Sequence, residues 1–285
     1  MKVGLIPASE GQFPVDGPAV AAIARAAEAS GFDSIWVGEH VVMPARQRQD
    51  YPGAAENRIG PRDTGTLPDP LEWLSFVAGA TERILLGTAI LLLPLHNPLV
   101  MAKRLSTLDR LSGGRVRLGI GLGWSEAEYE AVGVDFRTRG RRCDENVRAM
   151  REVWARSPAG YEGELFRFDP VHSLPQPAAG AVPILVGGDS EAAARRAGRI
   201  GDGYFPFGKD MDRLAHLLTV MRRAAEEAGR DPDAIELNGL GSRRPEVVER
   251  LAAMGFSRVV LFLPDPSVDG VERLGAQAAR LVEGA

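Results

Sequence analysis

Short apolar runs alternate with amphipathic segments along the chain, and this alternation restricts the fold more than any other feature. In the amphipathic segments apolar residues recur at helical spacing, as at Val20, Ile23 and Ala27. The apolar runs are three to five residues long and are typical of strands buried on both faces. They are Val3–Ile6, Ser34–Val37, Ile84–Gly87, Val116–Ile120, Ile184–Val186, Gly203–Phe205, Ile235–Leu237 and Val259–Leu263.

Helical patterns lie between the apolar runs. They cover Asp16–Ser30, Pro70–Thr81, Pro98–Leu111, Ser125–Val132, Arg141–Arg156, Ser190–Ile200, Met211–Ala228, Pro245–Met254 and Val268–Val282. Two stretches lack periodicity. Pro44–Pro68 is a long loop, and a loop of that length is usually functional or mobile. Tyr161–Pro177 is an irregular, partly extended insertion.

Strands that alternate with helices predict a parallel sheet. We therefore predict an α/β fold, a (β/α)8 TIM barrel with insertions after strands 2 and 4, as a single domain over residues 1–285. The length suits one such barrel, which typically has about 250 residues. A doubly wound open sheet is the alternative. It would need a phosphate loop after the first strand, where IPASEGQ offers only Gly11.

Charge and cysteine content exclude several classes of protein. A net charge of −4 argues against a nucleic-acid partner, which usually requires a basic surplus. The single cysteine, Cys143, excludes a disulfide scaffold, and its charged helical surroundings disfavour a catalytic thiol. The longest apolar run, Ala89–Leu95, is too short to span a membrane, and the N-terminus lacks a signal-peptide pattern. We expect a cytoplasmic protein with no membrane partner.

Active sites of TIM barrels lie at the carboxyl ends of the strands. Glu39 and His40 directly follow the second strand, where a carboxylate and an imidazole suit acid–base chemistry. A loop cap and a structural histidine are the alternative interpretation. Glu39 with Glu126 as a glycosidase pair is disfavoured, since only 6% of residues are aromatic. None of the four histidines has zinc-ligand spacing, so we expect no metal site.

Two glycine-rich runs follow predicted strands. RVRLGIGLGW spaces Gly119, Gly121 and Gly123 two residues apart, which misses the G-x-G-x-x-G dinucleotide fingerprint by one residue. ILVGGDSEAAARR places Gly187 and Gly188 before a helix that Asp189 or Ser190 would cap. A helix N-terminus favours phosphate, so we predict an anion site here, with a plain turn as the alternative. GDSEA departs from the nucleophile elbow G-x-S-x-G, because Ala192 replaces the last glycine.

Three stretches, two of which contain these glycine-rich runs, resemble one family. GFDSIWVGEH, NPLVMAKRLSTLDRLSGGRVRLGIGLGWSEAE and PILVGGDSEAAARRAGRIGDGYFP follow the order seen in the bacterial luciferase-like flavin and deazaflavin oxidoreductases. The TLDRLSGGR motif is distinctive, and the resemblance covers most of the chain. The pattern is most similar to the F420-dependent subgroup. The resemblance implies a barrel that holds coenzyme F420, or FMN as the alternative, with the ring at the strand ends.

The resemblance also implies roles for individual residues. His40 would donate or accept a proton, with Glu39 tuning it, although relatives carry aspartate where Glu39 stands. Thr88, Ala89 and Ile90 would form a bulge, often with a non-prolyl cis peptide, that supports the ring. Gly121 would let the backbone approach the ring. The cofactor phosphate would lie by four residues after the fifth strand: Gly187, Gly188, Asp189 and Ser190.

One departure from the family concerns the substrate. F420-dependent sugar-phosphate dehydrogenases carry a glutamate just after the glycines of the fourth strand, where this chain has Trp124. We therefore expect an apolar or aromatic small-molecule substrate, with packing beneath the long loop as the alternative role of Trp124. Basic residues would suit the acidic tail of F420, and candidates in the long loop are Arg46, Arg48, Arg58 and Arg62.

Three functions follow from the resemblance. The first is F420-dependent hydride transfer. The second is an FMN-dependent monooxygenase supplied by a separate flavin or F420 reductase. The third is a flavin- or deazaflavin-binding protein without turnover, which a histidine at a strand end disfavours. The family also implies a homodimer.

Overall fold

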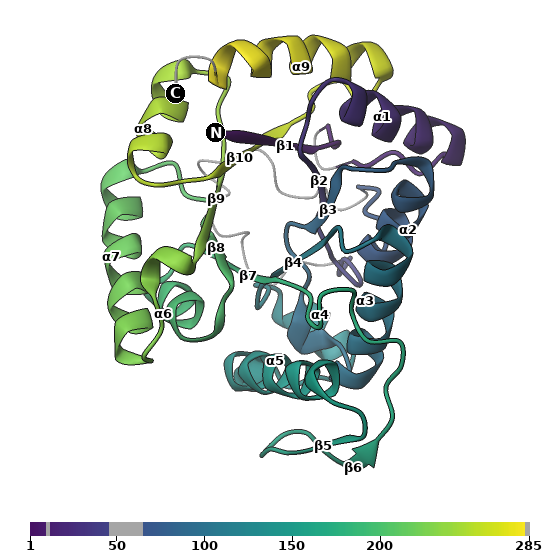
Figure 1. The fold of residues 1–285 in the computed structure, drawn as a ribbon, viewed down its shortest axis with the longest axis vertical. Helices are drawn as coiled ribbons and strands as arrows, with labels where there is room; N and C mark the ends of the chain where they lie inside the picture. The colour runs from purple at the N-terminus through teal and green to yellow at the C-terminus, as the bar shows by residue number, and fades with distance from the viewer. Residues whose placement is uncertain (10–11, 46–64, 283–285) are drawn as a thin grey trace.

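The computed structural model describes residues 1–9, 12–45 and 65–282, which form a closed barrel surrounded by helices (Figure 1). Neighbouring strands are parallel in the order β1-β10-β9-β8-β7-β4-β3-β2. The predicted (β/α)8 barrel is therefore confirmed, and the open-sheet alternative is wrong. The barrel strands are β1 (Lys2–Ile6), β2 (Ser34–Val37), β3 (Leu85–Thr88), β4 (Val116–Ile120), β7 (Ile184–Gly187), β8 (Gly203–Phe205), β9 (Glu236–Leu240) and β10 (Arg258–Phe262).

The helices begin and end close to the predicted positions, because side-chain caps mark many of their starts. Asp16, Asp69, Asn97 and Ser190 each accept hydrogen bonds from the first turn of the helix that follows. The helices are α1 (Gly17–Ala29), α2 (Pro70–Ala80), α3 (Pro98–Ser112), α4 (Glu126–Ala131), α5 (Arg139–Ala155), α6 (Glu191–Ile200), α7 (Met211–Glu227), α8 (Pro245–Ala253) and α9 (Val268–Val282). None of the helices within the described ranges is long and apolar enough to cross a membrane.

A β-hairpin lies between α5 and β7, where the sequence indicates an irregular insertion. Its strands are β5 (Ala159–Glu162) and β6 (Arg167–Val171), paired antiparallel. The buried carboxylate of Glu145 on α5 accepts three backbone N–H groups from the turn, those of Glu164, Leu165 and Phe166, at 3.0–3.2 Å. Pattern alone could not find the hairpin, because its turn is held by a residue from another element.

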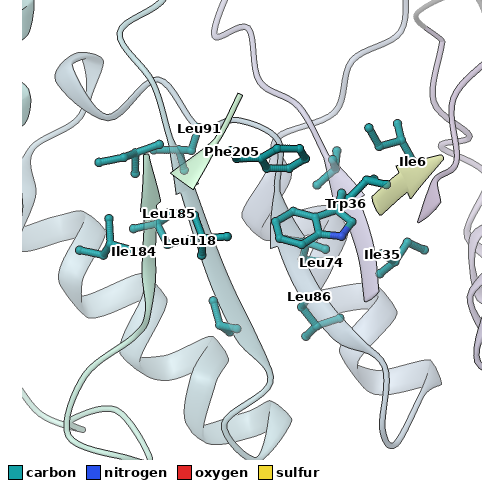
Figure 2. Packing of buried hydrophobic residues seen from close by; sticks show 14 of the residues in the cluster. Ile6, Ile35, Trp36, Leu74, Leu86, Leu91, Leu118, Ile184, Leu185 and Phe205 are labelled. Atoms are coloured by element: carbon teal, nitrogen blue, oxygen red, sulfur yellow. The ribbon is translucent and has the colours of Figure 1, made fainter. Parts of the chain in front are cut away.

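The barrel interior is filled by large side chains that need glycine beside them. Trp36 of β2 meets Phe205 of β8 edge to face, with ring centroids 5.3 Å apart (Figure 2). On the strands that flank β2, a Cβ at Gly87 would lie 2.1 Å from the indole, and one at Gly4 would lie 2.6 Å from it. Glycine on both neighbouring strands therefore makes room for the indole within the barrel.

A buried ion cluster closes the amino-terminal end of the barrel. Arg258, the first residue of β10, is 1% exposed and bonds the Asp33 carboxylate through Nε and Nη2 at 2.7–3.1 Å. Its Nη1 donates to Glu236 and to Asn238. Burial by itself lowers the pKa of Arg258, but the Asp33 and Glu236 carboxylates outweigh it and raise that pKa above its ordinary value. The cluster joins β10 to β9 and to the residue before β2.

Removing the buried guanidinium should destabilise the protein strongly. We expect Arg258→Ala to lower the free energy of unfolding by about 3–5 kcal/mol, because it removes a buried guanidinium and leaves two partly buried carboxylates without their cation. Urea denaturation followed by circular dichroism measures the change. The control is Arg222→Ala, which removes an exposed ion pair with Asp233 and should cost about 0–1 kcal/mol. Equal losses in the two variants would contradict a closing role for Arg258.

Candidate active site

The predicted site residues meet at one end of the barrel, because all eight described barrel strands run in the same direction. Glu39 and His40 follow β2, and Ala89 and Ile90 follow β3. Gly121 and Trp124 follow β4, and Gly188 to Ser190 follow β7. In Figure 1 the strands β2, β3, β4 and β7 are neighbours on one side of the barrel.

The segment after β3 forms a bulge bonded to both neighbouring strands. The Ala89–Ile90 peptide is cis, which agrees with the expectation from the family resemblance. Ala89 N donates to Val37 O of β2 at 2.8 Å, and Leu91 N donates to Gly119 O of β4 at 2.8 Å. Thr88 is buried, and its hydroxyl donates to the same Gly119 carbonyl at 2.6 Å. The side chain of Thr88 thus holds the bulge in place.

The glycines of RVRLGIGLGW make room for this bulge. A Cβ at Gly119 would lie 2.0 Å from Thr88 O, and a Cβ at Gly121 would lie 1.7 Å from Ile90 Cδ1. From the other side, a Cβ at Gly187 of β7 would lie 2.7 Å from Ile90 Cγ2. The space beside Gly121 that the sequence analysis assigns to a cofactor ring is therefore filled by Ile90. A direct contact of Gly121 with cofactor stays a prediction.

His40 is held by a carboxylate that the sequence analysis misses. Its Nδ1 lies 2.9 Å from Glu128 Oε2, and the side chains of His40 and Glu128 are 10% and 0% exposed. The other oxygen, Oε1, accepts the backbone N–H of Val41 at 2.7 Å. Ser125 and Glu128 have the S-x-x-E spacing of a capping box, and Ser125 Oγ accepts Glu128 N at 3.3 Å. A capping box would place the Glu128 carboxylate on the backbone N–H of Ser125. It instead bonds His40 and Val41, in the segment after β2.

Glu39 contacts a different histidine from the expected one. Its Oε1 lies 2.9 Å from His96 Nε2, and its Oε2 accepts Leu92 N at 2.6 Å. Glu39 thus does not bond His40 directly, and tuning of His40 by Glu39 stays a prediction. Although the two residues are neighbours in sequence, their side chains bond different elements: Glu39 bonds the segment after β3, and His40 bonds Glu128 of α4. A catalytic role for Glu39 stays a prediction, while its observed contacts fix the segment after the bulge.

Trp124 lies beside His40. The two ring centroids are 6.0 Å apart and the planes are nearly perpendicular, at 79°. Trp124 is half-buried, and Val41 and Val42, directly after His40, are exposed. The imidazole of His40 therefore has an indole ring and the Glu128 carboxylate as neighbours, and two exposed valines follow it in the chain.

The turn after β7 leads into α6 and is bonded both to β8 and to the loop after β8. Gly188 has a φ of +126°, which favours glycine, and its carbonyl accepts the Tyr204 hydroxyl at 2.9 Å. Ser190, rather than Asp189, caps α6, since Ser190 Oγ accepts Ala193 N at 3.1 Å. Asp189 Oδ1 accepts Phe207 N and Gly208 N at 2.7 and 2.8 Å. The predicted anion site therefore has its capped helix terminus, while phosphate contacts by these residues stay predictions.

The remaining expectations from the sequence concern a thiol, a group of arginines and a metal site. Burial raises the pKa of the Cys143 thiol to about 12, so it carries almost no thiolate at neutral pH. The arginines proposed for an acidic tail, Arg46, Arg48, Arg58 and Arg62, lie outside the described residues. No group of three or more His, Cys, Asp or Glu within the described ranges is arranged to hold a metal ion.

Adding a methyl group at Gly121 should disturb the bulge through Ile90. We expect Gly121→Ala to lower the free energy of unfolding by about 1–3 kcal/mol, because the new Cβ overlaps Ile90 Cδ1. Ile90→Val removes that atom and alone should cost about 0.5–1.5 kcal/mol. In the double variant the two losses should be less than additive by at least about 0.5 kcal/mol, measured by urea denaturation. Strictly additive losses would contradict the proposed contact.

Comparisons with known proteins show which family this chain is similar to. Residues 5–241 match the family model described as luciferase-like monooxygenase. An uncharacterised protein of Mycobacterium tuberculosis H37Rv is 33% identical over 91% of this chain and 93% of its own length. An F420-dependent glucose-6-phosphate dehydrogenase of Nakamurella multipartita is 34% identical over 80% of this chain and 63% of its own length.

A solved structure shows the same fold. An F420-dependent secondary alcohol dehydrogenase, in complex with an F420–acetone adduct, superposes with a TM-score of 0.79 over 98% of each chain, at 21% identity. The sequence match covers most of the chain, and the named relative from Nakamurella multipartita is a dehydrogenase. This protein therefore belongs to the luciferase-like monooxygenase family of oxidoreductase enzymes.

Proposed function

We propose that this protein is an F420-dependent oxidoreductase that transfers a hydride between the deazaflavin and a small apolar or aromatic substrate. The observation that carries the proposal is His40, fixed by a buried carboxylate beside Trp124 at the carboxyl end of the barrel. The relative from Nakamurella multipartita, named an F420-dependent dehydrogenase, supports the choice of cofactor.

The residues present fit a phosphorylated deazaflavin in two places. At the end of β3, Ala89 and Ile90 are half-buried, and their bulge offers an apolar surface to a planar ring. At the end of β7, the capped N-terminus of α6 follows two residues without side chains, Gly187 and Gly188, and a helix N-terminus favours phosphate. Bound F420 supplies the carbon that gives or takes the hydride, and the protein supplies position and electrostatics.

In this proposal the protein's own groups have separate tasks. His40 donates or accepts the proton that accompanies hydride transfer. Glu39, through Leu92 N and His96, keeps the segment after the bulge in place and thereby supports the ring from behind. Gly187, Gly188 and Ser190 hold the phosphate, and Asp189 keeps the neighbouring loop against it.

The substrate is proposed from Trp124. Sugar-phosphate dehydrogenases of this kind carry a glutamate at the corresponding position, whereas Trp124 presents an aromatic face beside His40. Val41 and Val42 add exposed apolar surface next to the same imidazole. An apolar alcohol or carbonyl compound suits these surroundings better than glucose 6-phosphate, whose phosphate needs cationic or hydrogen-bonding partners.

The family description itself favours a second candidate, an FMN-dependent monooxygenase that receives reduced flavin from a separate reductase. A flavin-binding protein without turnover is the third. A homodimer, which the family resemblance implies, and a cytoplasmic location, which the sequence indicates, also stay predictions. The cofactor experiment below distinguishes the first two candidates, and the turnover experiment tests the third.

Cofactor preference can be measured by binding alone. We expect the purified protein to quench the fluorescence of F420 on binding, with an affinity at least about tenfold higher than for FMN, a difference of about 1.4 kcal/mol. A deazaflavin that lacks the phosphate and the acidic tail serves as control and should bind more weakly if the α6 terminus holds phosphate. Tight FMN binding without any response to F420 would overturn the proposal in favour of the monooxygenase.

Turnover should depend on His40. Oxidation of a panel of alcohols, with glucose 6-phosphate included, is followed by F420 absorbance, and we expect activity with apolar alcohols but none with the sugar phosphate. With the best substrate, His40→Ala should lower kcat by about 10²–10⁴-fold while F420 still binds. Unchanged kcat would exclude proton transfer by His40, and an inactive wild type that binds F420 would favour the third candidate.

A further inference from the structure

Glu128 is a fully buried carboxylate whose two oxygens have different partners. Oε2 lies 2.9 Å from Nδ1 of His40, and Oε1 lies 2.7 Å from the backbone nitrogen of Val41. The nitrogen of Val42 is a more distant third neighbour of Oε1, at 3.5 Å. The Glu128 side chain is 0% exposed, so these protein groups take the place of water around the carboxylate.

The partners of this carboxylate determine which histidine nitrogen carries hydrogen. A backbone N–H only donates, so Oε1 must accept. An ionised carboxylate has no hydrogen to give, so Oε2 must also accept, and a neutral His40 must then carry its hydrogen on Nδ1. Its other nitrogen, Nε2, is left with the lone pair.

Within the described residues, Glu128 is the carboxylate that bonds the His40 ring. Glu39, the neighbour of His40 in sequence, uses both oxygens on Leu92 N and His96 Nε2. The edge-to-face contact with Trp124 adds a steric limit on rotation of the imidazole. Glu128 and Trp124 together therefore fix both the tautomer and the direction of the ring.

We infer that Glu128 is a positioning residue that holds His40 as the Nδ1–H tautomer, with Nε2 presented as the proton-accepting atom of the site. The catalytic meaning of this arrangement rests on the proposed function. In the direction of substrate oxidation, Nε2 would take the proton of the substrate hydroxyl while the hydride on the same carbon passes to the deazaflavin, which leaves a carbonyl group, and Glu128 would stabilise the imidazolium that results. In the reverse direction the same Nε2 returns the proton.

The tautomer can be measured in the protein without cofactor or substrate. Protein labelled with 15N-histidine is examined by NMR at about pH 9, where an ordinary histidine is neutral. The two kinds of ring nitrogen differ clearly in 15N shift, and His40→Asn assigns the signals of His40 among those of the four histidines. We expect the hydrogen on Nδ1. A signal from hydrogen on Nε2 in the wild type would overturn the inference.

Glu128→Gln tests the carboxylate itself. In the carboxylate His40 and Val41 bond different oxygens, whereas an amide has an oxygen at one of these two positions and a donor NH₂ group at the other. With its oxygen on Val41 N, its NH₂ group would face Nδ1 of His40, and the hydrogen of the imidazole should move to Nε2. Retention of the Nδ1–H tautomer in a folded Glu128→Gln protein would overturn the inference. If this variant does not fold, the wild-type spectrum decides.

A matched control separates this effect from the general loss of a buried carboxylate. Glu145→Gln makes the same chemical change at a buried residue that accepts three backbone N–H groups and contacts no histidine. It should cost stability yet leave the His40 tautomer unchanged. The same tautomer change in both variants would overturn a specific role for Glu128. Because all spectra are recorded without cofactor, failure of F420 binding would count against the proposed function and not against this inference.

Discussion

The position of Ile90 between β4 and β7 is the constraint on which the rest of the candidate site depends. The side chain lies where Gly121 and Gly187 have no Cβ, and the backbone around it bonds β2 on one side and β4 on the other. Glu39 N donates to Ile90 O at 3.1 Å, and Gly121 N donates to Leu91 O at 2.9 Å. The ends of three strands are thereby tied to one bulge, and that bulge forms part of the barrel mouth.

Two carboxylates hold histidine side chains in fixed positions beside this bulge. Glu39 and Glu128 are both buried, and each bonds one histidine and at least one backbone N–H. A buried carboxylate is costly unless such donors surround it, so each pair also holds together the segments it bridges. Glu128 connects α4 to the end of β2, and Glu39 connects the end of β2 to the segment after β3. His40 is consequently held from a distant part of the chain, 88 residues away.

Much of the fold could be predicted because its signals are local. Apolar runs and helical spacing located all eight barrel strands, and caps such as Asp69 and Asn97 fixed helix starts. The hairpin β5–β6 was missed because Glu145, from α5, holds its turn. At the site, His40 was found from its place at a strand end, and the family resemblance suggested only Glu39 as the carboxylate that tunes it. The structure instead gives His40 the carboxylate of Glu128.

The sequence by itself determined the barrel, the order of its strands along the chain and the end at which chemistry is expected, because periodicity and strand direction are properties of short segments. It also indicated that Gly119, Gly121 and Gly123 are no dinucleotide fingerprint. Only the tertiary structure decided what the glycines accommodate and which carboxylate meets which histidine. Those contacts join residues far apart in the chain, and their geometry arises only when β2, β3, β4 and α4 are packed together.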